Sequence, residues 1–153
     1  MPYLAMLDRL RAFLKQPASV LVLCGYSFRD DHINEVIVQG LQGTQTAIAF
    51  GLLYGEIGKY TKAVKLASNR PNLTLLAKDG AVVSAREAKW LEKEKESVDS
   101  DPQECISWEP LDPTNENSRR VARFHLGDFQ ICGKFVSELV GQIRQSTESA
   151  NAK

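Results

Sequence analysis

The chain has 153 residues, of which 43% are hydrophobic and 25% are charged. This length and composition are typical of one globular domain with an ordinary core, which excludes a chain that is disordered throughout. The formal net charge is zero, so the overall charge does not favour binding to DNA, RNA or an anionic membrane.

Targeting, membrane and metal signals are absent from the sequence. No stretch approaches the roughly 20 apolar residues that a membrane-spanning helix needs, and the N-terminus lacks the layout of a signal peptide. We therefore expect a cytoplasmic protein without a membrane partner. Cys24, Cys105 and Cys132 are far apart in sequence and form no C-x-x-C pair, so neither a disulfide framework nor a metal site is expected.

Helical and strand patterns alternate over the first half of the chain. The expected elements, in order, are a helix over 4–14, a strand over 19–24, a helix over 31–41, a strand within 47–54, a helix over 57–67 and a strand over 73–77. The strand segments show little polar alternation, as in parallel strands that are covered on both faces. This order predicts an α/β fold with a parallel sheet and right-handed crossovers, like half of a doubly wound sheet.

The composition changes after Trp90. Residues 91–117 are rich in charged residues, Pro and Ser, and we expect a surface excursion in which 92–96 extend a solvated helix and 106–109 form a short edge strand. Such a long segment also leaves open that it packs on a partner.

Order returns at 121–126, where the alternation predicts a strand. Gly127 and Asp128 predict a turn and a helix N-cap, and apolar residues up to Ile143 mark a long amphipathic helix. Residues 146–153 are expected to be a disordered tail.

The stretch from Val20 to Asn34 organises the chain, because an apolar strand stops at Gly25 and leads through a short loop into a helix that begins beside two aspartates. Ligands in open α/β sheets usually lie beyond the carboxyl end of such a strand. Ser27 offers a hydroxyl to a ribose or phosphate oxygen. The equally open alternative is that Gly25 only makes the turn and that Asp30 or Asp31 caps the helix.

Other polar residues have a functional and a structural interpretation. His32 lies in the first helical turn, where the helix dipole favours neutral imidazole, and it could accept from a ligand hydroxyl or lie idle at the surface. Asp79 and Asp128 follow later strands and would reach the same rim as Ser27, or serve only as turn and cap residues. His125 and Cys24 are interpreted as packed residues.

Several of these segments resemble the later part of bacterial sirtuin-like domains of antiphage defence systems. The resemblance lies in Pro2-Tyr3, in 10–14, in 20–28 and in 31–34, and Leu126-Gly127-Asp128-Phe129 with Phe135 and Leu139 is similar to the closing helix of those domains. It spans about residues 2–141 but covers only the second half of the family's domain. It implies that 1–145 form a partial Rossmann-like parallel sheet with flanking helices.

The resemblance implies NAD as the ligand, because defence members of this family bind NAD and hydrolyse it to nicotinamide and ADP-ribose. The turn Gly25-Tyr26-Ser27-Phe28, with Asp31 and His32, would contact the nicotinamide-side ribose and the phosphates. Asp79, Gly127 and Asp128 would lie nearer the adenosine.

The Gly-rich phosphate loop and the catalytic Asn and His of the family belong to its first half and have no candidate here. We therefore expect no catalytic residue in this chain, no NAD hydrolysis by the chain alone, and an uncovered sheet edge that drives formation of a homo-oligomer or pairing with a complementary subunit. Two other classes stay open, a non-catalytic assembly module and a small nucleotide-binding regulator of another α/β family.

Overall fold

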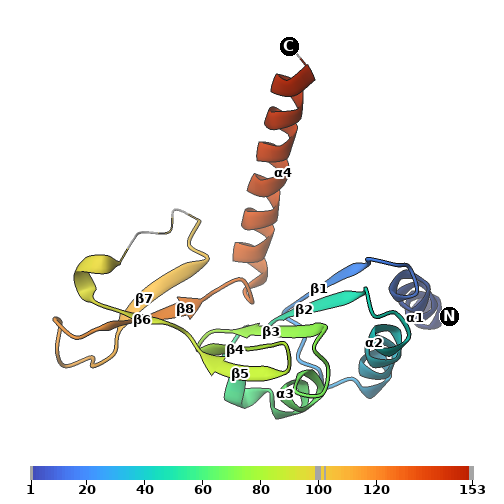
Figure 1. Ribbon diagram of the computed structural model, residues 1–153, viewed down its shortest axis with the longest axis horizontal. Coiled ribbons are helices and arrows are strands. Elements are labelled where there is room, and N and C mark those ends of the chain that lie inside the picture. The colour runs from blue at the N-terminus through green and yellow to red at the C-terminus, as the bar shows by residue number, and fades with distance from the viewer. Residues whose placement is uncertain (1, 99–100, 102, 152–153) are drawn as a thin grey trace.

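The computed structural model describes residues 2–98, 101 and 103–151, which form two sheets, three helices beside the larger sheet and one long projecting helix (Figure 1). The elements are α1 (Pro2–Leu14), β1 (Val20–Cys24), α2 (Asp31–Gly43), β2 (Ile48–Leu52), the 3-10 turn η1 (Ile57–Lys59), α3 (Thr61–Ala67), β3 (Leu73–Ala77), β4 (Gly80–Val83), β5 (Arg86–Lys89), β6 (Glu92–Lys93), the 3-10 turn η2 (Lys95–Ser97), β7 (Ile106–Pro110), β8 (Arg120–Phe124) and α4 (Phe129–Asn151).

The larger sheet has the strand order β1-β2-β3-β4-β5, with β1, β2 and β3 parallel. The predicted α/β fold with a partial Rossmann-like sheet is therefore confirmed. The antiparallel β4 and β5 were not anticipated. They are joined through Ser84 and Ala85, both in the left-handed region with φ of 49° and 64°, and this pair lacks the Asn-Gly or Asp-Gly signature of tight hairpins.

One face of the parallel strands is covered by helices. The core on this side joins Ile37 and Leu41 of α2 and Ala63 and Ala67 of α3 to alternate strand residues; those of the sheet are Ala49, Leu73, Leu75, Ala77 and Val82. Side chains that alternate with these point away from α2 and α3.

The opposite face is partly open, contrary to the expectation of cover on both faces. Val20, Val22 and Ile48 are 52%, 55% and 39% exposed. β1 is also the outermost strand of the sheet. The interpretation of β1 as an interior strand of a wider sheet is therefore not met among the described residues. An apolar strand pattern reports burial potential, and the covering element can lie outside the described chain.

Much of the expected surface excursion belongs to a second sheet, with the order β6-β8-β7. The predicted strands at 106–109 and 121–126 are confirmed as β7, an edge strand, and β8. The solvated helix expected at 92–96 is wrong, because Glu92 and Lys93 pair with Val121 and Arg120 of β8. Alternating Glu and Lys suit a helix, but cross-strand pairing here outweighs that local preference.

The two sheets are joined at Trp90, which lies between β5 and β6, and at Phe124, whose N–H donates to the carbonyl oxygen of Lys78 at 3.1 Å. The Trp90 indole N–H donates to the carbonyl oxygen of Ala77 at 2.8 Å, and its ring lies 5.8 Å from that of Phe124. α4 then leaves the body of the molecule (Figure 1). It is helical as far as Asn151, which differs from the tail expected from Ser146; residues 152–153 lie outside the described part.

Candidate functional site

The turn after β1 is held by Gly25, whose φ of +67° is in the left-handed region that glycine enters without strain. Its N–H donates to the carbonyl oxygen of Leu52 at 3.0 Å, which extends the β1–β2 ladder by one residue. The chain therefore turns at the carboxyl end of the first two parallel strands, where the sequence predicts a ligand site.

Tyr26 and Phe28 stabilise this loop from inside. The Tyr26 hydroxyl lies 2.9 Å from Oδ1 of Asn34 and 3.1 Å from the carbonyl oxygen of Asp30, and Nδ2 of Asn34 donates to the carbonyl oxygen of Phe28 at 2.8 Å. Burial, followed by the charge of Asp30, raises the pKa of Tyr26 to about 12. The Phe28 side chain is 1% exposed and belongs to the core, so a ligand could reach little of this residue except its backbone.

The start of α2 resolves the alternative left open for the two aspartates. Asp30 is the N-cap, and its Oδ1 accepts from the backbone N–H groups of His32 at 2.9 Å and Ile33 at 3.1 Å. These bonds, the one from Ile33 foremost, lower the pKa of the Asp30 carboxyl. Asp31 forms an ion pair with Lys62, and the side chain of His32 is exposed.

Asp79 has a structural role. Its Oδ1 accepts from the N–H of Ile57 at 2.7 Å and its Oδ2 lies 2.6 Å from Nζ of Lys89. Burial alone would raise its pKa, but the bonds from Lys89 and Ile57 lower it below the usual value. The carboxylate thus ties η1 and β5 to the β3–β4 turn.

Gly127 and Asp128 dock the start of α4 on the carboxyl ends of β1 and β2. A Cβ at Gly127 would overlap the Leu53 carbonyl group and lie 2.6 Å from the backbone nitrogen of Tyr54. The Cys24 thiol donates to the carbonyl oxygen of Leu126 at 3.5 Å, and burial, with Cys132 as neighbour, raises its pKa to about 11. Cys24 is therefore protonated at neutral pH, as expected of a packed residue and not of a nucleophile.

Asp128 confirms the predicted N-cap, since its Oδ1 accepts from the N–H of Gln130 at 2.8 Å. His125, interpreted as a packed residue, is half-buried with its Nε2 2.7 Å from the Ser107 hydroxyl. Gly25 and Gly127, far apart in sequence, are brought together: a Cβ at Gly25 would lie 3.9 Å from the Gly127 carbonyl oxygen.

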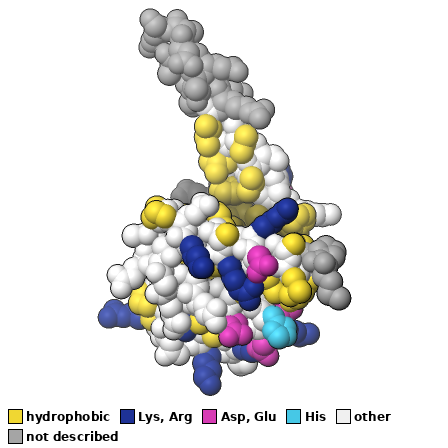
Figure 2. Space-filling view, turned by 90° about the vertical axis from the view of Figure 1, so that its right-hand side faces the viewer, with side chains coloured by type: hydrophobic (Ala, Val, Ile, Leu, Met, Phe, Trp, Pro, Cys, Tyr) yellow, Lys and Arg dark blue, Asp and Glu magenta, His cyan; other side chains and the backbone are white. Residues whose placement is uncertain are grey.

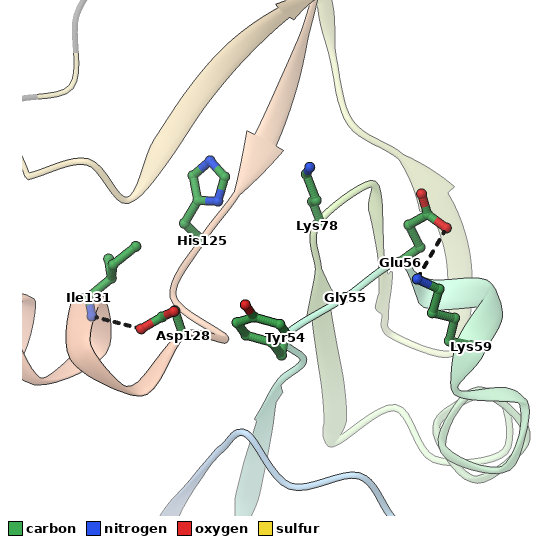
Figure 3. A pocket seen from close by; sticks show the side chains of 8 residues that line it. All are labelled: Tyr54, Gly55, Glu56, Lys59, Lys78, His125, Asp128 and Ile131. Carbon is green, nitrogen blue, oxygen red and sulfur yellow. Dashed lines mark hydrogen bonds and ion pairs between the residues drawn. The ribbon is translucent and has the colours of Figure 1, made fainter.

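A cavity of about 350 Å³ opens beside Asp128 at the start of α4 (Figure 3). It is lined by Tyr54, Gly55, Glu56, Lys59, Lys78, His125, Asp128 and Ile131. Figure 3 shows His125, Asp128 and Ile131 on one side and Glu56 and Lys59 on the other, with Tyr54 between them. Lys78 lies 3.3 Å from Glu109, and the Lys59–Glu56 pair is loose at 4.0 Å, so Lys59 is the cation more accessible to a ligand.

A second hollow of about 320 Å³ lies next to the first and shares Lys59 with it. It is lined by Ser27, Phe28, Arg29, Lys59, Tyr60, Thr61 and Lys62. The structure thus assigns Ser27 and Phe28 to one hollow and Asp128 to the other, whereas Asp79, Asp31 and His32 line neither. A polar ligand with negative charge suits these walls, because Arg29 and Lys59 have long basic side chains at the rim, whereas Lys62 is paired with Asp31.

Sequence reasoning missed Tyr54, Glu56, Lys59 and Lys78, which line the first cavity from η1 and from the segments that follow β2 and β3. Tyr54 and Lys78 follow their strands closely, so the rule that singled out Ser27 could have found them. Lys59 offered no such signal, because its place depends on how η1 folds back over the strand ends.

Within the described residues, no group of three or more His, Cys, Asp or Glu side chains is arranged to hold a metal ion, and no helix is long and apolar enough to cross a membrane. No family model matches the chain, and no curated protein matches it either.

Proposed function

We propose that this chain is the C-terminal part of a sirtuin-like NAD-binding and NAD-hydrolysing domain of the bacterial antiphage defence type, acting in the cytoplasm. The resemblance of 20–34 and 126–129 to that family suggests NAD. The observation that carries the proposal is the left-handed Gly25 turn at the carboxyl end of a parallel strand, beside two adjoining hollows that share Lys59.

The geometry suits a dinucleotide better than a small anion. Two hollows of about 320 and 350 Å³ meet at Lys59, so a ligand with two nucleoside halves could occupy both while its diphosphate lies near this ammonium group. Ser27 and Arg29 would contact one half, and Tyr54 would offer its ring, 69% exposed, to the other.

In this proposal the described residues contribute binding groups, and the catalytic centre lies on another polypeptide. The thiol of Cys24 is protonated at neutral pH, and Nε2 of His125 lies 2.7 Å from the Ser107 hydroxyl. In this proposal a complementary subunit supplies the remaining residues, and the chain alone binds NAD weakly without cleaving it.

Calorimetric titration with NAD, ADP-ribose and nicotinamide tests the proposal. We expect weak binding of NAD and ADP-ribose, none of nicotinamide, and no nicotinamide release by chromatography. Lys59→Glu should weaken NAD binding at least tenfold, whereas Lys65→Glu, an exposed lysine of α3 outside both hollows, should not.

Three results would count against it. Turnover of NAD by the purified chain would show that the catalytic residues are present after all. If neither NAD nor ADP-ribose bound at millimolar concentration, NAD would be refuted as the ligand. A different mononucleotide that raises the melting temperature while NAD does not would select the regulator class.

A second candidate, a non-catalytic assembly module, is favoured by a different observation. The edge of β1 and one side of α4 are apolar and exposed, which is typical of a surface that another polypeptide covers.

A further inference from the structure

The two edges of the larger sheet differ in how they are protected. The outer strand β5 has the sequence Arg86-Glu87-Ala88-Lys89, and charges on an edge strand discourage further pairing. The opposite edge strand, β1, consists of Val20 to Cys24 without a charge, a proline or a bulge. The sheet is therefore closed to addition on one side and open on the other.

The backbone of β1 shows which groups are available at this edge. The carbonyl oxygen of Ser19 accepts from Ile48 at 2.9 Å, and the N–H of Gly25 donates to Leu52 at 3.0 Å, so odd-numbered residues face β2. Because backbone groups alternate along a strand, Val20, Val22 and Cys24 direct their N–H and C=O groups to the open edge. These are the donors and acceptors that a further strand needs.

α4 adds an apolar surface beside the same edge. It starts at the carboxyl end of β1 and extends past this strand, away from the rest of the sheet (Figure 1). Figure 2, viewed from the side of α1 and α2, shows hydrophobic side chains gathered where the helix stands clear of the body. Val136, Leu139 and Val140 are 49%, 44% and 43% exposed.

We propose that a second copy of this chain covers this edge, with the two β1 strands paired antiparallel about a two-fold axis at Val22. Val22 then lies opposite Val22 of the second copy, and Val20 lies opposite Cys24. In a two-fold symmetric contact the same strand lies on both sides of the interface. A charged side chain near the axis would therefore face the same charge on the second copy, and β1 avoids this repulsion because it has no charged residue.

The proposed pairing also gives α4 a contact. In an antiparallel pair the carboxyl end of one strand lies beside the amino end of the other. The α4 helix of each copy therefore approaches the amino end of the other copy's β1, which follows α1. Phe13, close to the end of α1 that leads into β1, is 37% exposed, which makes an apolar counterpart for Val136 and Leu139.

The helix contact is needed on grounds of area. A five-residue strand pair buries well under the roughly 800 Å² per partner of a stable interface, and the stripe on α4 with the end of α1 supplies the additional apolar surface. The whole chain has no net charge, so two copies do not repel each other at long range.

Sedimentation equilibrium of the full chain at micromolar concentration, without nucleotide, tests the proposal. We expect a dimer, a dissociation constant raised at least tenfold by Val22→Lys or by Leu139→Lys, and protection of the Val22 amide from hydrogen exchange that grows with protein concentration. Two matched controls should dimerise like the unchanged protein: Val83→Lys, at an exposed strand valine of β4, and Ser137→Lys, at an exposed position of α4 that lies off its apolar side. Circular dichroism confirms that each variant is folded.

A monomer at these concentrations would overturn the proposal, as would a dimer that Val22→Lys leaves intact or an unprotected Val22 amide in the dimer. Dimers weakened by Leu139→Lys but not by Val22→Lys would indicate pairing of α4 helices instead and would equally overturn it. The readout contains no NAD, so this inference can fail while NAD binding stands, and the reverse.

Discussion

Replacing Gly127 by alanine tests how the start of α4 is held on the sheet. Gly127 is buried in the turn after β8, and a Cβ there would overlap both the carbonyl oxygen and the carbonyl carbon of Leu53. Leu53 itself cannot retreat easily, because its N–H donates to the carbonyl oxygen of Leu76 at 2.8 Å and its side chain is 1% exposed.

The expected cost follows from what the methyl group would meet. Overpacking in a core costs about 1–3 kcal/mol, and the atoms in the way here are backbone atoms with no alternative rotamer, so we expect a loss of about 3 kcal/mol. For a chain of this size that loss corresponds to a melting temperature lower by roughly 6–12 °C. The turn would move away from β2, and the bond from the Cys24 thiol to Leu126 would be lost with it.

Urea denaturation followed by circular dichroism gives the free energy of unfolding. Gly133→Ala is the matched control, because a Cβ at Gly133 in α4 meets nothing within 4 Å. Alanine is the better helix former by up to about 1 kcal/mol, so the control should be as stable as the unchanged protein or more so. A Gly127→Ala variant within about 0.5 kcal/mol of the unchanged protein would refute the close packing of this turn on β2.

The remaining predictions concern the loop and the β3–β4 turn. Phe28→Ala should lower the free energy of unfolding by about 3–5 kcal/mol, because a large buried ring is removed, whereas Ser27→Ala, at an exposed residue, should change it by less than about 0.5 kcal/mol; similar losses in thermal melts would show that Phe28 is not a core residue. Asp79→Asn should destabilise the protein at neutral pH, because the bonds from Lys89 and Ile57 lower the pKa of this carboxyl in the folded state. Since a depressed pKa stabilises the fold above the unfolded value of 3.8 and that contribution is lost as the pH falls through the folded value, the two melting temperatures should converge in acid. A constant difference across this range would contradict the assignment.

Local pattern was enough to predict most elements of the α/β core. The apolar runs that end at Cys24 and Ala77 form strands, and the segment with helical spacing after Asp31 forms α2. The spacing of apolar residues within each segment fits only one type of secondary structure. The same logic predicted Asp128 as an N-cap, since an aspartate before an amphipathic run satisfies the free N–H groups of the first turn.

Tertiary structure decided which of these residues share a site. Asp79 and Asp128 follow strands in the same way, yet pairing of β4 and β5 directs the first to Lys89 while the second lines a cavity with Lys59. The sequence could not distinguish a Phe28 that contacts a ligand from one that is buried in the core. Only its packing against β2 shows that Phe28 is a core residue. Such outcomes depend on contacts between segments far apart in the chain.

The sequence by itself determined the type and order of the helices and strands in residues 2–77, because capping, glycine turns and hydrophobic period act within a few residues. Only the tertiary structure decided that β1 is an outer strand with a bare edge, that residues near 92 pair with β8, and that Lys59 joins two hollows. The physical reason is that strand order, edge exposure and cavities arise from pairing and packing between distant segments, whose free energies no single stretch of sequence contains.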